Sequence, residues 1–369
     1  MKIKNLLVSM LLLGFILNLA LYTSSFAMEK KQEKKTQQAT REIFPQEINT
    51  VFEEGIQQRQ VRPDIPFSII KHYYLPAMDN LHNIFLFKVK NADLGFAPIM
   101  PAAEIPEKKE KEEKEKEEEI SSFESEPNNL QANSHVFIQF NLLENDSLGT
   151  LVKKVYIPVR IQADGSDYEP DKEDIYSTGY PLPPGDYLMS MAITSQDLTK
   201  IGTQYFEFSI PDPASFTDTL DTTPIFFVKK IEKMASAEMT AEVHKDIFTY
   251  SVLQIEPNLD NVFTPGEYLD IFFYVFGTQT KEDGRCSIEV NYQVFKEDKV
   301  IIRWEPRVYD TFPLVSQPLP MKSTVIIKSE EGERTEQRDL EPGMYTLVVK
   351  ITDMLSEKSV EKRVDFEVK

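Results

Sequence analysis

A short turn motif occurs twice in this chain, and the residues that follow each copy match in register. Residues 182–187 read LPPGDY, and residues 340–345 read LEPGMY. After each motif, apolar residues alternate with other residues, and a second alternating run containing Phe208 or Phe366 follows at the same spacing. Period-two alternation over four or more positions is typical of half-buried strands. The repeat therefore predicts two copies of one β-rich unit.

The same motif predicts how each unit turns. Proline followed by glycine suits the two central positions of a type II turn, where the second residue needs a positive φ. Gly185 and Gly343 take that position. A tyrosine that opens the next strand is the layout of a tyrosine corner, in which the hydroxyl bonds to backbone upstream. Tyr187 and Tyr345 are therefore the predicted structural corner residues.

On this element and the strand pattern, the chain resembles fibronectin type III and immunoglobulin-like domains, which carry a similar leucine, proline-glycine and tyrosine run. The resemblance implies an all-β fold of two tandem β-sandwich domains. Many short alternating strands separated by proline and glycine are typical of the same class. The two-unit layout is also similar to that of uncharacterised secreted sandwich proteins found with GWxTD domains, although the Gly-Trp-x-Thr-Asp motif itself is absent.

Weaker internal similarities set the expected domain boundaries. Residues 84–87 (IFLF) parallel 271–274 (IFFY), and residues 136–140 (VFIQF) parallel 287–291 (SIEVN). The expected organisation is a linker with a short helix at 28–60, a first sandwich at 61–212, an interdomain segment at 213–243 and a second sandwich at 244–369. Within it, short helices are expected at about 46–60 and 235–244.

Consecutive aromatic residues predict contact between the two units. Phe272, Phe273 and Tyr274 follow one another, so both faces of that strand are apolar. One face is expected in the core of the second unit, and the other under the neighbouring unit. Residues 223–233 (TTPIFFVKKIE) are expected to lie between the units, at a firm interface.

The first 27 residues have the features of an export signal. Lys2 and Lys4 precede an apolar run at 6–22, and Ser25-Phe26-Ala27 is a small-x-small site, so cleavage after Ala27 is expected. An uncleaved anchor is the alternative, because the run is nearly long enough to span a bilayer. No later run is as long, so the mature chain is expected in the periplasm or outside the cell, with no membrane span. Cys286 is the only cysteine, which excludes an intramolecular disulfide.

A charged low-complexity insertion interrupts the first unit at about 101–132. Residues 104–119 read EIPEKKEKEEKEKEEE and have no apolar stripe that could be buried. The insertion is expected to be a solvated loop between two strands, where added length costs little. A docking element for a basic partner is the alternative.

Composition and motifs exclude several classes of function. The formal net charge of −19 disfavours nucleic acid, because phosphate binding relies on lysine and arginine. The sequence contains no dinucleotide-binding glycine motif, no P-loop, no G-x-S-x-G elbow and no H-E-x-x-H. The four histidines, His72, His82, His135 and His244, form no close-spaced pair. We therefore expect no enzyme and no cofactor.

One acidic run leaves calcium open as a ligand. Asp164, Asp167, Glu169 and Asp171 lie close together, and oxygen ligands at alternate positions can converge on Ca²⁺ where the chain bends. Pro170 stiffens the run, and the glycine of an EF-hand loop is missing. A solvated loop is the competing interpretation.

These features together predict an exported, non-catalytic binding or structural protein of the cell envelope that acts through β-sandwich surfaces. Its expected partner is a protein, a cell-envelope polymer or a second copy of the chain. The alternative function is a carbohydrate-active enzyme of the envelope, with a site on the sandwich loops.

Overall fold

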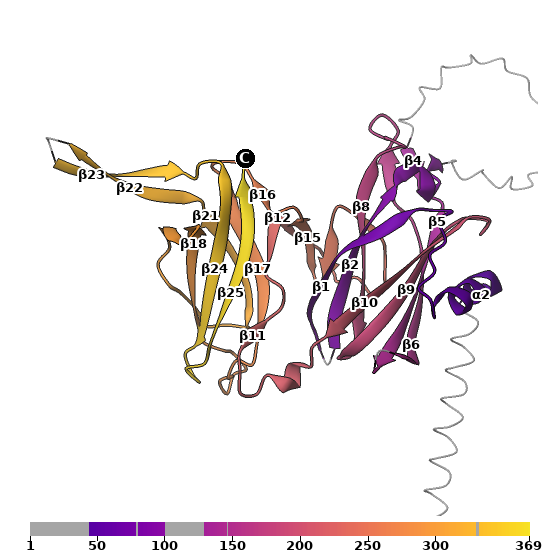
Figure 1. Cartoon of the computed structure of the whole chain (residues 1–369), viewed down its shortest axis with the longest axis horizontal. Helices are drawn as coiled ribbons and strands as arrows, with labels where there is room; N and C mark the ends of the chain where they lie inside the picture. Colours follow the sequence, from indigo (N-terminus) through magenta and orange to yellow (C-terminus); the bar gives the residue numbers. More distant parts are fainter. Residues whose placement is uncertain (1–43, 79, 100–128, 146, 330–331) are drawn as a thin grey trace, which may run out of the picture.

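The computed structural model describes residues 44–78, 80–99, 129–145, 147–329 and 332–369. Within them the fold is all-β, and its larger sheets pack face to face as two pairs, which lie side by side in Figure 1. We call them the first and second sheet pairs. The expected signal peptide at 1–27, most of the linker before the helix and the charged run at 104–119 fall outside the described residues.

The first sheet pair holds one apolar core between two four-stranded sheets. Sheet 1 has the order β1-β2-β8-β13, and sheet 2 has the order β10-β9-β5-β6. Their bounds are β1 Phe67–Ala77, β2 Asn80–Lys90, β5 Ser134–Glu144, β6 Ser147–Pro158, β8 Glu173–Leu182, β9 Gly185–Ser195, β10 Ile201–Ile210 and β13 His244–Lys245. Alternate residues of these strands, such as Phe85, Phe140 and Tyr187, fill the space between the sheets.

The second sheet pair is built in the same way. Sheet 3 has the order β11-β17-β12-β15-β14, with β21 also paired to β17; sheet 4 has the order β16-β25-β24-β18-β19, with β20 also paired to β18. Their bounds are β11 Asp221–Thr222, β12 Phe226–Lys233, β14 Phe248–Tyr250, β15 Leu253–Asn258, β16 Val262–Phe263, β17 Tyr268–Phe276, β18 Ile288–Lys296, β19 Lys299–Arg303, β20 Arg307–Tyr309, β21 Leu314–Pro320, β24 Gly343–Asp353 and β25 Ser359–Val368.

Smaller elements lie at the ends of both sheet pairs. The strands β3 (Ala97–Pro98), β4 (Asn129–Gln131) and β7 (Gln162–Asp164) form a small sheet, and a 3-10 turn, η1 (Asn91–Leu94), follows β2. A second such turn, η2 (Pro213–Ser215), precedes β11. The hairpin of β22 (Lys322–Ser329) and β23 (Gly332–Asp339) projects from the second sheet pair at the far left of Figure 1.

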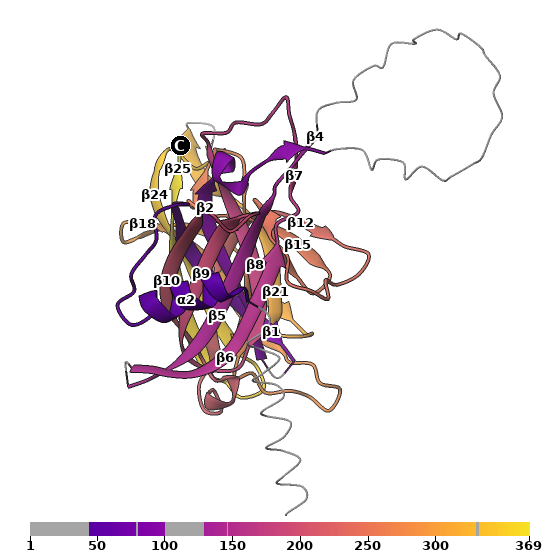
Figure 2. The ribbon, with the colours of Figure 1, turned by 90° about the vertical axis from the view of Figure 1, so that its right-hand side faces the viewer.

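The helix α2 (Gln46–Gly55) covers the outer face of sheet 2, as Figure 2 shows. Ile48, Val51 and Phe52 recur at helical spacing on its buried side. They pack against Phe137 and Ala192 of the sheet. The helix expected at 46–60 is therefore present, but it ends at Gly55.

A third apolar cluster joins the two sheet pairs. Tyr73 and Leu86 on the outer face of sheet 1 meet Phe226, Phe248 and Phe272 from sheet 3. Phe272 and Phe273 point to opposite faces of β17, since Phe273 belongs to the core of the second pair. The two faces of this strand are both buried, and Figure 1 shows β12 and β15 between the two halves.

The chain crosses between the sheet pairs more often than the sequence indicates. Residues 213–243 were expected to be an interdomain segment, yet β12 lies inside sheet 3, and Phe227 fills its core. The chain then returns, and β13 pairs with β8 at the edge of sheet 1. A boundary at residue 244 therefore does not separate the two sheet pairs. Strand β12, before it, belongs to the second pair, and β13, after it, belongs to the first.

The helix expected at 235–244 is also wrong. Residues 235–243 form bends and irregular loop, and His244 enters β13. The sequence of this segment has little apolar periodicity, so a helix here would bury little. Pairing with β8 instead keeps the backbone extended at His244 and Lys245. We call residues 234–247 the return segment.

Among the described residues, none of the helices is long and apolar enough to cross a membrane.

Candidate functional site

The two predicted corners have matching geometry. The Tyr187 hydroxyl donates to the carbonyl of Pro183 at 2.9 Å, and the Tyr345 hydroxyl donates to the carbonyl of Glu341 at 2.7 Å. Burial raises the pKa of Tyr187, so its hydroxyl keeps its proton and stays a donor. These are the upstream backbone bonds that a tyrosine corner requires.

The glycines of the corners also match each other, but not an ideal type II turn. Their φ angles are 150° at Gly185 and 149° at Gly343, beyond the value of about 80° that a type II turn has at this position. A side chain at Gly185 would also meet Leu142, because a Cβ there would lie 2.9 Å from Leu142 Cδ2. The corner therefore needs glycine for its positive φ and, at Gly185, for space.

The carboxylates considered for calcium do not converge. Asp164 Oδ1 accepts hydrogen bonds from the backbone N and the Oγ of Ser166, each at 2.9 Å, and these bonds lower the pKa of Asp164. Asp171 is almost fully exposed and lies 4.0 Å from Lys90. Within the described ranges, no three histidine, cysteine or acidic residues gather in a way that could hold a metal ion. Asp164 instead ends β7, and Asp167, Glu169 and Asp171 lie in the turn-rich loop that follows it.

A cleft of about 710 Å³ opens on the outer face of sheet 1, where it meets β14 and the return segment. Pockets that bind small ligands have volumes of this order. Its walls come from the end of β1, the start of β2, β8, the return segment and the region of β14. Histidine, glutamate and aromatic side chains line it, among them His82, Tyr180, Glu238, Glu242, His244 and Tyr250.

A hydrogen-bonded carboxylate lies at the centre of the polar wall. Glu238 Oε2 accepts from the Nε2 of His244 at 3.0 Å and from the Oγ1 of Thr249 at 2.9 Å. These three residues come from the return segment, β13 and β14. The carboxylate therefore ties an irregular loop to two strands, and its position in the cleft is fixed.

The opposite wall is shaped by a close approach of His82 to β8. A Cβ on Gly179 would lie 2.5 Å from the Nε2 of His82, so the imidazole occupies space that only glycine leaves free. Burial lowers the pKa of His82, although a hydrogen bond that the imidazole donates to the backbone of Thr249 and the charge of Glu238 act in the opposite direction. His82 is therefore neutral near pH 7.

The return segment is anchored beside the cleft by a buried carboxylate. Asp174 of β8 contacts the Nζ of Lys245 at 2.5 Å and the Nδ2 of Asn91 at 2.9 Å. Burial acts to raise the pKa of Asp174, but hydrogen bonds from Lys245, Asn91 and Lys172 outweigh burial and lower it. Ser177 adds a further bond, from its Oγ to the carbonyl of Ile247 at 2.5 Å. The wall of the cleft thus rests on ionic and neutral bonds to sheet 1.

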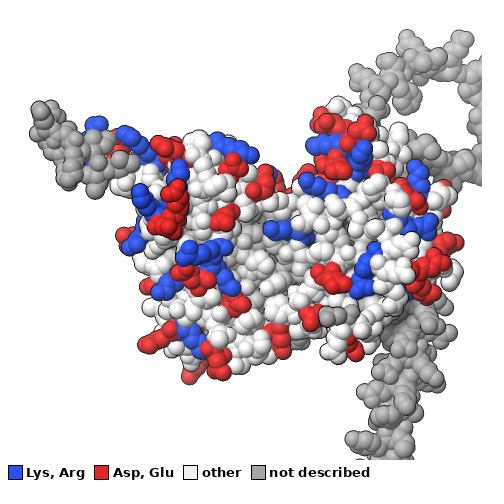
Figure 3. Space-filling view, in the orientation of Figure 1, with Lys and Arg blue, Asp and Glu red and all other residues white. Residues whose placement is uncertain are grey.

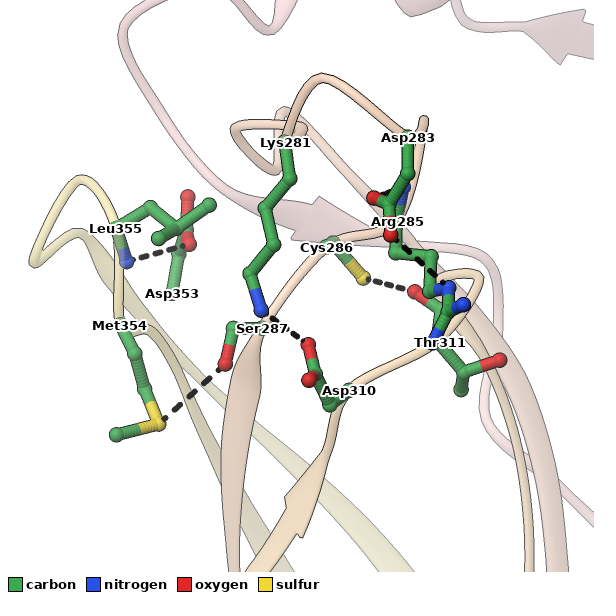
Figure 4. A network of polar contacts seen from close by, with 10 residues as sticks. All are labelled: Lys281, Asp283, Arg285, Cys286, Ser287, Asp310, Thr311, Asp353, Met354 and Leu355. Atoms are coloured by element: carbon green, nitrogen blue, oxygen red, sulfur yellow. Dashed lines mark hydrogen bonds and ion pairs between the residues drawn. The ribbon is translucent and has the colours of Figure 1, made fainter.

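A second polar network joins the loops at one end of the second sheet pair (Figure 4). Lys281 lies 2.5 Å from Asp310, and the backbone N of Leu355 donates to Asp353 at 3.0 Å. The thiol of Cys286 is buried and donates to the carbonyl of Thr311 at 3.0 Å. Burial raises the pKa of Cys286, so the sulfur stays protonated and a poor nucleophile. This network holds loops together.

No family model matches this chain, and no curated protein is significantly similar to it. The face seen in Figure 3 carries acidic and basic side chains intermingled over both halves. The site is therefore defined by geometry alone.

Sequence reasoning missed the cleft. His82 and His244 were noted there only as isolated histidines, and Glu238 was not singled out. The cleft-lining residues lie far apart in the sequence, and no local spacing connects them. Only the return of the chain to sheet 1 brings Glu238, His244 and Thr249 together.

Proposed function

We propose that this chain is an exported, non-catalytic binding or structural protein of the cell envelope, and that it acts through its β-sandwich surfaces. We also propose that its two sheet pairs are immunoglobulin-like or fibronectin type III-like units derived from one ancestor. The matching corners and the equivalent strand orders β10-β9-β5-β6 and β25-β24-β18-β19 support the second statement. The apolar run before Ser25-Phe26-Ala27 supports export.

The cleft between the sheet pairs is the observation that carries the binding role. It has the volume of a ligand site, combines aromatic and polar walls, and holds an oriented carboxylate at Glu238. The large apolar cluster beneath it joins the sheet pairs into a firm base. A preformed site on a rigid base loses little conformational entropy when a ligand binds.

An enzyme is less well supported by this geometry. A catalytic acid in a cleft is expected to have a raised pKa. Burial raises the pKa values of Asp246 and Asp270, but neither residue lines the cleft. We therefore retain the binding role and propose a protein or an envelope polymer as the partner, with a second copy of the chain as the other candidate.

A co-sedimentation experiment with purified envelope fractions tests the role. Thr240→Trp places a large ring in the cleft, whereas Met344→Trp places the same ring at an exposed position on β24. We expect the wild type and Met344→Trp to sediment with the envelope and Thr240→Trp to stay in solution. Equal sedimentation of both variants, or none by the wild type, contradicts a binding role for the cleft.

A further inference from the structure

We infer that the cleft recognises an organic cation, an ammonium or guanidinium group carried either by a free amine or by a basic side chain of a partner. This inference rests on the proposed binding role of the cleft and adds the chemical class of its ligand. Four features of the described walls lead to it: their charge, the hydrogen bonding of Glu238, their aromatic surface and the state of their histidines.

The charged side chains that line the cleft are of one sign. Glu238 and Glu242 both contribute to its walls, and no lysine or arginine is among the described residues that do so. Elsewhere, acidic groups near the cleft are neutralised by lysine, as Asp174 is by Lys245. A surface lined by one sign of charge concentrates ligands of the opposite sign.

Glu238 keeps one oxygen available for a ligand. Both hydrogen bonds that it receives, from His244 and Thr249, end on Oε2. In the described part of the chain, Oε1 receives no hydrogen bond, and about a quarter of the side chain remains exposed (28 %). Because His244 and Thr249 already fix the carboxylate, an incoming donor would bind an oriented acceptor.

Aromatic and thioether groups complete the walls. The partly buried Tyr250 lines the cleft over the buried ring of Phe248, and the exposed Met78 and Met239 line it as well. The faces of aromatic rings attract ammonium and guanidinium groups.

The histidine beside β8 does not oppose a cation. Since burial lowers the pKa of His82, the imidazole carries no positive charge near pH 7. The Nε2 of His244 is directed at Oε2 of Glu238, 3.0 Å away, and leaves Oε1 of that carboxylate without a hydrogen bond in the described walls. Two carboxylates therefore dominate the field inside the cleft.

Isothermal titration with four probes of similar size tests the inference. The cationic probes are the N-acetyl methylamides of lysine and arginine, and the matched neutral and anionic probes are those of glutamine and glutamate. Cadaverine and a short lysine-containing peptide then separate a free amine from a basic side chain as the source. We expect the cationic probes to bind the wild type at least about tenfold more tightly than the neutral probe, as one charge-assisted hydrogen bond provides.

Two matched variants locate the binding. Glu238→Gln keeps an oxygen that accepts from His244 and Thr249 but removes the charge, and we expect it to weaken cation binding about tenfold or more. Glu232→Gln removes an exposed carboxylate of β12 that does not line the cleft, and we expect no change. Unchanged melting of both variants shows that each one is folded.

Three results would overturn the inference: equal binding of the neutral and cationic probes, an equal effect of the two variants, or no binding of any cationic probe. If the wild type still sediments with the envelope and Thr240→Trp does not, the cleft remains a binding site for another class of ligand. If that difference is lost too, the proposed function fails with the inference.

Discussion

The ring of Tyr187 stacks on that of its cross-strand partner Phe208, with the ring centroids 5.4 Å apart. Tyr345 and Phe366 repeat the arrangement in the second sheet pair, with the centroids 5.6 Å apart. In both places the tyrosine hydroxyl reaches back across the turn to a carbonyl four residues earlier. Each corner thereby links the core packing of a strand to the turn before it.

Removing one corner hydroxyl is expected to cost about 1 kcal/mol of unfolding free energy, because a partly buried hydrogen bond to the backbone is lost. Tyr187→Phe and Tyr345→Phe each make this change, and chemical denaturation measures it. Tyr268→Phe, at a residue that is 55 % exposed, is the matched control and is expected to be neutral. If both corner variants were as stable as the control, the hydroxyl bonds would have no structural role.

Acid is expected to destabilise the protein partly through His72. This side chain stacks on Phe85 at 4.9 Å between ring centroids, and burial lowers its pKa to about 4, while a hydrogen bond to Asn83 acts in the opposite direction. Its pKa in the unfolded chain is about 6.5. The unfolded state therefore binds a proton first, and stability is lost as the pH falls from about 6.5 to about 4, by at most about 3 kcal/mol.

The variant His72→Gln isolates this contribution. Denaturation between pH 7 and pH 4 should show a shallower loss of stability in the variant than in the wild type, because glutamine does not titrate. His135→Gln is the control, since it changes a half-buried histidine on β5, in the other sheet of the same pair. Parallel pH profiles of the wild type and His72→Gln would show that His72 is not held neutral by its surroundings.

The apolar cluster between the sheet pairs is expected to contribute as much as a core. Phe272→Ala removes a ring from this cluster, and Phe273→Ala removes one from the core of the second pair. Each should cost about 3–5 kcal/mol. Phe312→Ala, at a residue that is 67 % exposed, should change little. If Phe272→Ala behaves like Phe312→Ala in calorimetry, the two pairs are not packed together.

Deletion of residues 107–119 is expected to leave the melting temperature almost unchanged. The strands on either side of this charged run already meet, since Pro98 of β3 pairs with Leu130 of β4. Shortening a loop whose ends are held together costs little entropy. A fall of several degrees in melting temperature would show that the run packs against the folded part.

Export is expected to remove the first 27 residues. N-terminal sequencing of the protein recovered from the envelope or the medium should begin at Met28. A chain that retains its first residues and stays with membranes would instead support the uncleaved anchor.

The sequence predicted the features that depend on a short stretch of neighbouring residues, such as strand periodicity. The alternation after Tyr187 and Tyr345 identifies β9 and β24, because a strand buried on one face shows its period in a single stretch of sequence. The consecutive aromatic residues of β17 likewise predicted two buried faces, and Phe272 and Phe273 occupy them.

Contacts between residues far apart in the chain could not be predicted from the sequence. The pairing of β13 with β8 joins His244 to Ser177, and no local pattern encodes that distance. The acidic run that begins at the end of β7 was considered for calcium from its spacing alone, but the Asp164 carboxylate accepts a hydrogen bond from the backbone N of Ser166 in the turn that follows. The cleft exists only because the chain returns to sheet 1, so its residues could not be grouped from the sequence.

Methyl NMR of the protein labelled at methionine tests the central claim most directly. Met78 and Met239 line the cleft, whereas Met344 and Met354 are exposed elsewhere and serve as internal controls. On titration with the N-acetyl methylamide of lysine, the account predicts that the signals of Met78 and Met239 shift together and saturate, while those of the controls stay in place. Shifts confined to Met344 or Met354, or no shift at any methionine, would contradict it.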